Sequence, residues 1–548
     1  MQKEAAMRAE AAVKKEEAMR AEAAVQKDAA VQKEAAVKKE AATQEEVAVQ
    51  KDAGRQEEEA MRQKNVGAYL SIFMSLTLTL VLSLCLVLIE GARQNTIRLE
   101  TECVVDIGVN SVLAEYHREA LEQYNLLFVD SSYGTDYPSY YNTEAHLREY
   151  LDKNVSLQEE LGILADNSFF QSVYMDLLAL SFSEVKVTGV SLATDNNGYN
   201  FQKQAIQAAE SDIGIGIIEE VMSWIEVVET HSLLDNRMEE ELDAVEQQLN
   251  TLRGKRQLED NTWITVEVEN PISDITDDRR KGLLNWVADD IGEISEKVVD
   301  LDQYISSRRK RQQMNKGNIV SEEKLSFYEK LVFQEYLFRY AGNYLEIKEN
   351  AQLDYQIEYL LFGTDSDTEN LRKTAAAICG MREVANMIYL MGDSEKKELV
   401  SAASAVLAAA LFIPEAAPVF EAVILLGWSC LESLQDIRIL LEGGKVPLLK
   451  DTSSWNCSLE NVFGGSAEGR GKDSVGLQYQ DYLRLFMYFA DTEDVTYRFM
   501  DVMEMDIRRT EGNENFRIDG CIDYLEVQVT AASDYGYTYH LKHAKGYR

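Results

Sequence analysis

The sequence is poor in proline, histidine and positive charge, and each shortage narrows what the protein can be. Five prolines in 548 residues favour long, uninterrupted helices. Five scattered histidines and the absence of an HExxH motif argue against a metal site. The 94 acidic residues outnumber the 55 basic residues, and the formal net charge is −39. Because so acidic a surface repels phosphate groups, binding to nucleic acid is disfavoured.

Cysteine is also scarce. The six cysteines form no CxxC pair and have no zinc-like spacing. Cys379 and Cys430 lie in apolar helical stretches, where we expect buried, reduced thiols. Cys457 and Cys521 are candidates for a disulfide bond, and the sequence leaves that question open.

Sequence signatures of catalysis are missing as well. No GxSxG or SxxK motif occurs. The stretch GSAEGRGKDS (465–474) lacks the glycine and the Ser or Thr that a phosphate-binding loop requires. TDNNGYN (194–200) and DSDTEN (365–370) lack the spacing of a calcium loop, so we expect turns or helix caps there. We therefore predict that the protein is not an enzyme, with no catalytic, cofactor-binding or metal-binding residues.

A long uncharged run is the clearest feature that is present. Residues 68–89 contain no charge and are rich in Leu, Val and Ile. As a helix they would span about 33 Å, enough for a hydrocarbon layer of about 30 Å. The run is longer than the apolar part of a signal peptide, and its end, LIEGARQ, is a poor cleavage site. Residues 67–90 are therefore predicted to be a retained transmembrane anchor.

The basic residues beside the anchor predict its orientation. Two of them, Arg93 and Arg98, follow the anchor, and four precede it: Lys51, Arg55, Arg62 and Lys64. By the positive-inside rule, the N-terminus is cytoplasmic. The predicted location is the plasma membrane, with a single pass and with residues 91–548 as an acidic extracellular domain, which possibly has two lobes.

A second apolar stretch, residues 399–431, is interrupted by Pro414, Glu415, Pro418 and Glu421. Its two pieces are too short to span a bilayer independently. We predict a buried helical hairpin, although entry into the membrane stays open.

The segment before the anchor is repetitive. Nine copies of a six-residue unit, each beginning with an acidic residue, fill residues 4–57. Six residues turn a helix by about 600°, so the apolar positions visit three sides and form no coiled-coil seam. We predict a solvated, low-complexity helix over 1–66. It is a spacer, a dock for a partner or a repeat without a role, and a translation start at Met61 would remove it.

Beyond the anchor, the pattern predicts a mostly helical α+β fold. The apolar residues from Ile97 to Leu113 recur at mostly helical spacing, so the anchor is predicted to continue into an amphipathic helix. Other elements that we expect are a short strand over 126–130, a strand that runs into a turn at Asp195–Gly198, long helices over 278–312 and 321–362, and a C-terminal β-hairpin that turns at Ser533–Gly536.

Several ordered motifs resemble one family. The anchor YLSIFMSLTLTLVLSLCLVLIEGAR is followed by ECVVDIGVNSVLAEYHREALEQYNLLFVDSSYG, and later come EYLLFGTDSDTENLRKTAAAICGMREVANMIYLMGD, GWSCLESLQDIRILLEGGKVPLLKD and GLQYQDYLRLFMYF. Together they are similar to an uncharacterised family of single-pass membrane proteins from clostridia and relatives. Genes of that family tend to lie beside those of Tad-type (Flp) pili and small TadE-like proteins.

The resemblance implies a role in assembling or presenting a surface structure. The implied partners are the membrane and proteins of a pilus or secretion apparatus, including TadE-like membrane helices. A pilin-like anchor would carry Glu five residues after a cleaved Gly, but the residue at that distance from Gly67 is Ile72. This departure argues against processing as a pilin subunit.

Three hypotheses follow. The first is a non-enzymatic cell-surface protein whose anchor and adjoining helix pack against neighbouring membrane helices. The residues that we predict to matter for this packing at the membrane exit are Glu90, Arg93, Glu115, Tyr116, Arg118, Tyr124 and Asp130. The second is an extracellular enzyme that acts on cell-wall polymer through a carboxylate pair. The third is a surface sensor whose cytoplasmic repeat recruits a partner.

Overall fold

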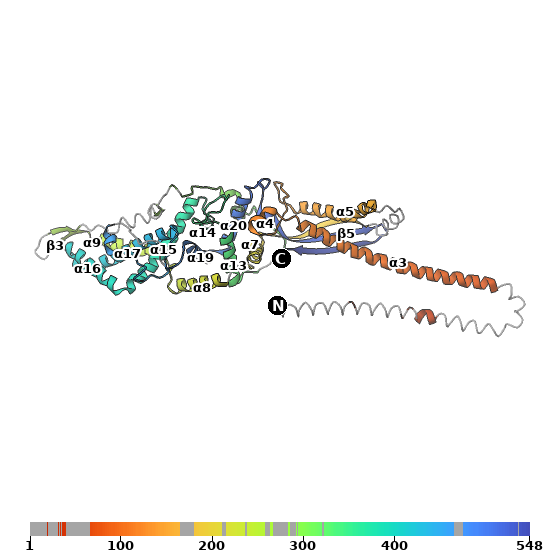
Figure 1. The fold of residues 1–548 in the computed structure, drawn as a ribbon, viewed down its shortest axis with the longest axis horizontal. Coiled ribbons are helices and arrows are strands. Elements are labelled where there is room, and N and C mark those ends of the chain that lie inside the picture. Colours follow the sequence, from red (N-terminus) through yellow and green to blue (C-terminus); the bar gives the residue numbers. More distant parts are fainter. Residues whose placement is uncertain are drawn as a thin grey trace. The chain divides into compact units, whose positions relative to one another are not determined.

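The structure is a computed structural model (Figure 1). It describes residues 66–164, 180–210, 215–235, 238–257, 294–319, 323–464, 475–534 and 536–547, and short pieces at 19, 31, 33, 35–39, 263–266, 283–284 and 292. The chain divides into two compact units, Met1–Asn95 and Thr96–Arg548. Nearly all of the predicted repeat at 4–57 lies outside the described residues.

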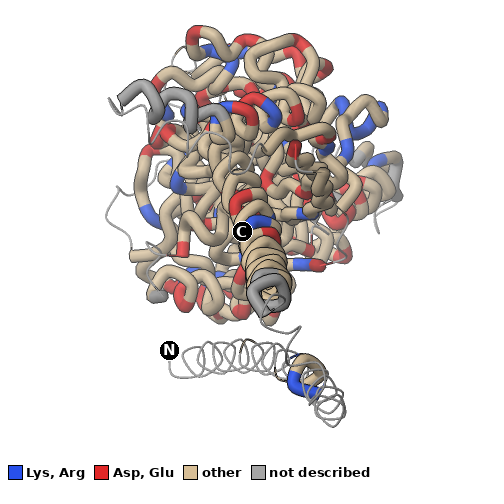
Figure 2. The backbone as a smooth tube through the Cα atoms, turned by 90° about the vertical axis from the view of Figure 1, so that its right-hand side faces the viewer, with Lys and Arg blue, Asp and Glu red and all other residues tan. Residues whose placement is uncertain are grey.

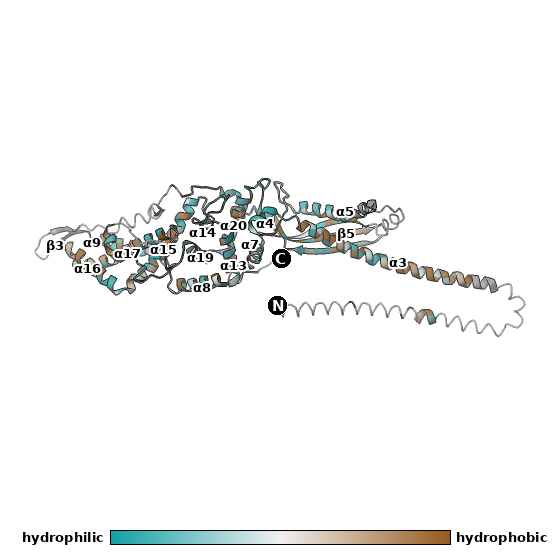
Figure 3. Ribbon diagram, viewed as in Figure 1, coloured by the Kyte–Doolittle hydropathy of each residue, from teal (hydrophilic) through white to brown (hydrophobic). Residues whose placement is uncertain are grey.

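The predicted anchor is part of one long helix. Helix α3 (Val66–Leu113) runs without a break from the first unit into the second, as the apolar periodicity predicts. Within its part from Ile72, the most apolar 18-residue window has no residue buried within the protein, and Figure 3 shows the hydrophobic colouring of this helix. By length and composition this helix is able to cross a membrane.

The second apolar stretch has a different environment. Helices α16 (Ser394–Ala410) and α17 (Ala417–Leu441) are joined by the short 3₁₀ helix η4 (Pro414–Ala416), which holds the first of the two interrupting prolines. Of the apolar window in Pro414–Leu441, 72% is buried inside the protein. These residues therefore form a core helix, in agreement with the predicted helical hairpin.

The second unit contains an antiparallel sheet. Strand β5 (Cys521–Ser533) is its centre and pairs with β1 (Val129–Asp130), β2 (Leu180–Leu192) and β6 (Thr538–Gly546). The β5–β6 connection closes through a hydrogen bond from the Gly536 amide to the Ser533 carbonyl, at 2.9 Å. The predicted C-terminal hairpin and its turn are thus confirmed.

The outer edge of β2 is covered by Asn318 over residues 188–190. Asn318 accepts a hydrogen bond from the Val190 amide (2.8 Å), returns one from its own amide to the Val190 carbonyl (3.1 Å), and donates from Nδ2 to the Thr188 carbonyl (2.9 Å). Asn318 therefore replaces the neighbouring strand that β2 lacks. In the part of the chain that the structure describes, no strand pairs with the outer edge of β6.

One hydrophobic cluster joins α3 to this sheet, and we call it the sheet cluster. It contains buried apolar side chains of α3, of α5 (Tyr140–Leu164) and of strands β1, β2 and β5. The helices α3 and α5 meet closely at Gly108, where an added Cβ would lie 2.8 Å from Leu151 Cδ2. Burial of these apolar side chains of α3 explains why the residues after the anchor have the pattern of an amphipathic helix.

The second hydrophobic cluster, which we call the helical cluster, fills the rest of the second unit. Around it lie α4 (Arg118–Tyr124), α7 (Asp195–Ala209), α8 (Ile215–Thr230), α9 (Met238–Leu252), η3 (Leu301–Gln303), α12 (Ile305–Lys310), α13 (Phe327–Tyr340), α14 (Gln356–Phe362), α15 (Asp367–Gly392), α16, α17, α18 (Leu459–Gly464), α19 (Tyr479–Phe489), α20 (Thr492–Ile507) and η5 (Ile518–Gly520). Strands β3 (Gly254–Gln257) and β4 (Trp263–Val266) form a separate antiparallel pair. Acidic and basic residues are interspersed over the backbone of this unit (Figure 2).

Two predicted helices are wrong in part. Residues 294–300 are not helical, because the Val299 amide bonds the Asp365 carbonyl (2.9 Å) and the Asp367 amide bonds the Lys297 carbonyl (3.0 Å). The predicted helix 321–362 is two helices, α13 and α14, with a loop between them. Most of 278–293 lies outside the described residues.

The state of the cysteines shows whether Cys457 and Cys521 form a disulfide bond. All six are free, and Cys379, Cys430, Cys457 and Cys521 are buried. The structure therefore contains no bond between Cys457 and Cys521, and the predicted reduced thiols at Cys379 and Cys430 are confirmed.

Fully buried ion pairs distinguish the helical cluster. The Arg382 guanidinium, on α15, donates from Nε to Asp436 of α17 at 3.0 Å, and also to the carbonyls of Pro447 and Leu448. Lys450 pairs with Glu432 and Asp436 in the same network. These contacts hold the segment after α17 against α15 and α17.

Candidate functional sites: the end of the anchor helix and a polar cavity

The structure distributes the predicted packing residues over four places. Glu90 and Arg93 form an i,i+3 ion pair on α3 in the first unit, with Nη1 and Oε2 3.3 Å apart. Arg118 is the first residue of α4, and its exposed side chain pairs with Glu122. Tyr124 is completely buried in the helical cluster and donates to Asp506 at 2.9 Å.

Glu115, Tyr116 and Asp130 come together where α3 ends. With His117 they line a small cavity of about 220 Å³, together with residues 132–134 and 512–516. Tyr116 also forms an isolated antiparallel bridge with Val129. We call this group of residues the helix-end cluster.

The Glu115 carboxylate joins α3 to α5. It accepts a hydrogen bond from the Tyr150 hydroxyl (2.8 Å) and lies 3.0 Å from Nδ1 of His146. His146 in turn stacks on Tyr133, with ring centroids 3.9 Å apart. The end of α3 is therefore fixed by polar contacts as well as by the sheet cluster.

Asp130 and His117 have altered protonation equilibria. Asp130 accepts from the Ser132 amide (2.9 Å) and hydroxyl (2.7 Å), and burial raises the pKa of its carboxyl group. Burial lowers the pKa of the His117 imidazole, whose Nε2 lies 3.0 Å from Asn513 Oδ1. Both groups are held by neighbouring elements, and their arrangement positions the end of α3 rather than exposing a reactive atom.

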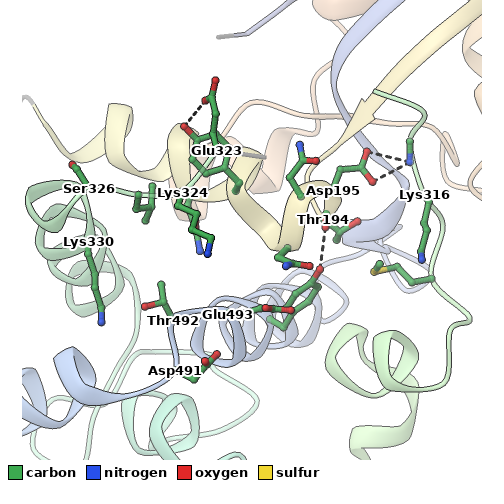
Figure 4. A pocket seen from close by; sticks show the side chains of 18 of the residues that line it. Thr194, Asp195, Lys316, Glu323, Lys324, Ser326, Lys330, Asp491, Thr492 and Glu493 are labelled. Atoms are coloured by element: carbon green, nitrogen blue, oxygen red, sulfur yellow. Dashed lines mark hydrogen bonds between the residues drawn. The ribbon is translucent and has the colours of Figure 1, made fainter. Parts of the chain in front are cut away.

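A larger cavity, of about 900 Å³, lies elsewhere in the second unit (Figure 4). Its walls come from the start of α7, the segment 314–317, the segment 323–330 and the start of α20. The lining residues are Thr194, Asp195, Asn196, Asn197, Tyr199, Gln202, Met314, Lys316, Gly317, Glu323, Lys324, Leu325, Ser326, Phe327, Lys330, Asp491, Thr492, Glu493 and Tyr497. We call it the polar cavity.

A left-handed turn builds one wall of the polar cavity. Asn196, Asn197 and Gly198 have φ of 55°, 57° and 79°. Asn and Gly tolerate this region best, which explains why the sequence TDNNG turns here as predicted. Asp195 fixes the turn, because its carboxylate accepts from the amides of Leu192 (2.8 Å) and Gly317 (3.0 Å).

The acidic side chains of the polar cavity already have partners. Burial raises the pKa of Asp195, which accepts the two amide hydrogen bonds above. Glu323 accepts from the Tyr199 hydroxyl at 2.7 Å, Glu493 pairs with Arg309, and Asp491 caps α20 by accepting from the Asp494 amide at 2.9 Å.

Sequence reasoning missed this cavity. Its residues come from four segments that are far apart in the chain, and their spacing carries no motif. The one usable signal was TDNNGYN, which the sequence identifies only as a turn. No group of three or more His, Cys, Asp or Glu with metal-binding geometry occurs among the described residues.

Comparison with known proteins places part of the chain in a family. Residues 261–533 match a family model described as a family of unknown function (DUF5702). This range covers most of the helical cluster and all of β5, whereas α3, α5 and β2 lie outside it. No curated protein and no solved structure matches the chain. The match supports the expectation of an uncharacterised family and supplies no activity.

Proposed function

We propose that the protein is a non-enzymatic, single-pass membrane protein that holds residues 91–548 at the outer cell surface, where it serves the assembly of a Tad-like pilus or secretion apparatus. One observation carries the proposal. A single helix, α3, is apolar and bare over its first half and is packed into the sheet cluster over its second half. A bare apolar helix of this length is stable in lipid.

An exposed stripe on the second half of α3 supports contact with a neighbouring helix. Leu99, Cys103 and Ile107 are spaced by four residues, so they share one face. Leu99 is 62% exposed and Ile107 47% exposed. Their face is opposite to the one that Ile97, Val105 and Val109 bury, and it continues the apolar surface beyond the anchor.

The identity of the apparatus rests on the family resemblance alone. The genes of the resembling family lie beside those of Tad-type pili and TadE-like proteins, whose membrane helices are partners of suitable chemistry. Small or apolar faces of membrane helices associate by close packing.

The orientation is tested with the protein's own thiols. Cys103 is exposed, Cys85 lies within the apolar stretch and the other four cysteines are buried. A membrane-impermeant maleimide should therefore label the chain in intact cells, and Cys103→Ala should abolish the label. Labelling that requires permeabilised cells would place Cys103 in the cytoplasm and contradict the proposal.

The assembly role is tested by crosslinking in intact cells, purification of the full chain and mass spectrometry of the captured proteins. We expect pilus or secretion components, and we expect their yield to fall when Leu99 and Ile107 are both replaced by Ser. Val406→Ser is the matched control, since Val406 is an apolar residue on α16 that is even more exposed than Leu99 and Ile107. Recovery of the chain without such components, or an equal loss with the control, would refute the assembly role.

A further inference from the structure

The polar cavity has the size and the lining of a ligand site. Small-molecule sites have volumes of about 300–1,000 Å³ and place a few polar groups at defined positions. At about 900 Å³, the polar cavity accommodates one or two sugar rings. Amide and hydroxyl side chains line it on several sides, and Figure 4 shows them on walls from different elements.

One buried hydroxyl group in this cavity lacks a partner. Thr194 is 1% exposed, and its Oγ1 makes no hydrogen bond within the part of the chain that the structure describes. Its backbone carbonyl, in contrast, accepts from the Tyr497 hydroxyl at 3.0 Å. A buried hydroxyl without a partner costs free energy, and a bound polar group would remove that cost.

The charges that remain uncommitted are positive. The four acidic residues of the lining are engaged as described above, and Lys330 donates to the Tyr488 carbonyl at 2.7 Å. Lys316 and Lys324 form no ion pair among the described residues, although the chain as a whole is strongly acidic. Their ammonium groups are therefore available to an anionic group.

Two helix ends and an aromatic ring complete the lining. α13 and α20 both begin at the cavity wall, at Phe327 and Thr492, and each helix end is capped within the protein, the first by Ser326 with Glu329 and the second by Asp491. The Phe327 ring is 48% exposed and offers a flat apolar surface among the polar groups. A sugar ring, with hydroxyls at its rim and C–H groups on its face, suits such a mixture better than a purely ionic ligand does.

We propose that the polar cavity binds an acidic sugar, that is, a hexose-sized ring that carries a carboxylate or a phosphate. Lys316 and Lys324 lie on opposite sides of the cavity (Figure 4), so one of the two receives the anionic group, and the Thr194 hydroxyl and the amide side chains receive the ring hydroxyls. The proposal does not depend on the function of α3.

The test is a binding measurement on the full chain in detergent micelles, by isothermal titration calorimetry. The probes are glucuronate, glucose 6-phosphate, glucose and inorganic phosphate. We expect both acidic sugars to bind at least about tenfold more tightly than glucose or inorganic phosphate. Glucose lacks the anionic group, and inorganic phosphate lacks the sugar ring. Comparison of the two acidic sugars distinguishes a carboxylate from a phosphate source.

Three variants locate the site. Lys316→Gln with Lys324→Gln should weaken binding of the acidic sugar about tenfold or more, whereas Lys397→Gln, an exposed lysine of α16, should leave it unchanged. Thr194→Val should weaken binding about fivefold without lowering the melting temperature, since the hydroxyl has no partner in the protein.

Several results would overturn the inference. If glucose bound as tightly as the acidic sugars, the lysines would have no role in recognition. If inorganic phosphate bound as tightly as the acidic sugars, the site would not recognise the sugar ring. No binding by any probe, or binding that is unchanged in both the lysine and the Thr194 variants, would remove the site.

Discussion

The sheet cluster and the helical cluster differ in the kinds of side chain that they bury. The sheet cluster holds α3 almost entirely with Val, Leu, Ile and Phe side chains. The helical cluster adds buried ion pairs, such as Arg382 with Asp436 and Arg308 with Glu504 and Asp519. Apolar packing tolerates exchange of similar side chains, whereas a buried ion pair fails when one partner is lost. The sheet cluster should therefore tolerate core substitutions better than the helical cluster does.

The largest expected effect comes from removing a buried charge. Arg382→Met should destabilise the protein by about 3–5 kcal/mol, because buried Asp436 loses one of its two cationic partners and the buried carbonyls of Pro447 and Leu448 lose their donor. Arg372→Met is the matched control on the same helix; its exposed pair with Glu369 should contribute less than about 1 kcal/mol. Chemical denaturation measures both. Equal losses would show that burial of the pair is not what matters.

A smaller effect is expected from overpacking the sheet cluster. Gly108→Leu places a side chain against Leu147 and Leu151, and we expect a loss of about 1–3 kcal/mol. Gly91→Leu on the same helix has open space around it and should cause no such loss. Faster hydrogen exchange in α5 and β2 of the Gly108 variant alone would locate the damage. Unchanged exchange there would contradict the close contact of α3 with α5.

The last effect is a dependence of stability on pH that belongs to the helical cluster. Burial raises the pKa of Glu358 and of Asp501 to about 7 each. Between about pH 4 and pH 7 the folded protein then binds more protons than the unfolded chain does. The stabilising contribution is complete below about pH 4 and is lost as the pH rises through 7.

The melting temperature should accordingly be lower at pH 8 than at pH 5. Glu358→Gln, which stays neutral, should reduce this dependence on pH. A melting temperature that rises from pH 5 to pH 8, or a variant with an unchanged pH profile, would contradict the assignment.

Local patterns in the sequence predicted the parts of the fold that local forces determine. The apolar periodicity of α3 and the turn after Ser533 depend on neighbours in the chain, and both were confirmed. The break between α13 and α14 depends on distant groups, because Gln356 accepts from the Gly342 amide and Glu358 from the Tyr344 amide. No local pattern reveals these acceptors, so the sequence predicted one helix.

The candidate sites follow the same rule. Glu115, Tyr116 and Asp130 are close in the chain, and the structure brings them together around one small cavity. Tyr124 lies only eight residues after Tyr116, yet it packs into the other cluster, since α4 turns away from α3. Thr194 and Lys324 meet at the polar cavity from distant segments, and only the tertiary fold shows that they share it.

The side chain of Asn318 on the edge of β2 limits how copies of the sheet can join. Asn318 occupies the β2 edge at Thr188 and Val190, so a strand of a second copy would find the Val190 amide and the carbonyls of both residues already bonded. The described outer edge of β6 has no paired strand. Association of copies through the sheet is therefore expected along β6 rather than at this part of β2.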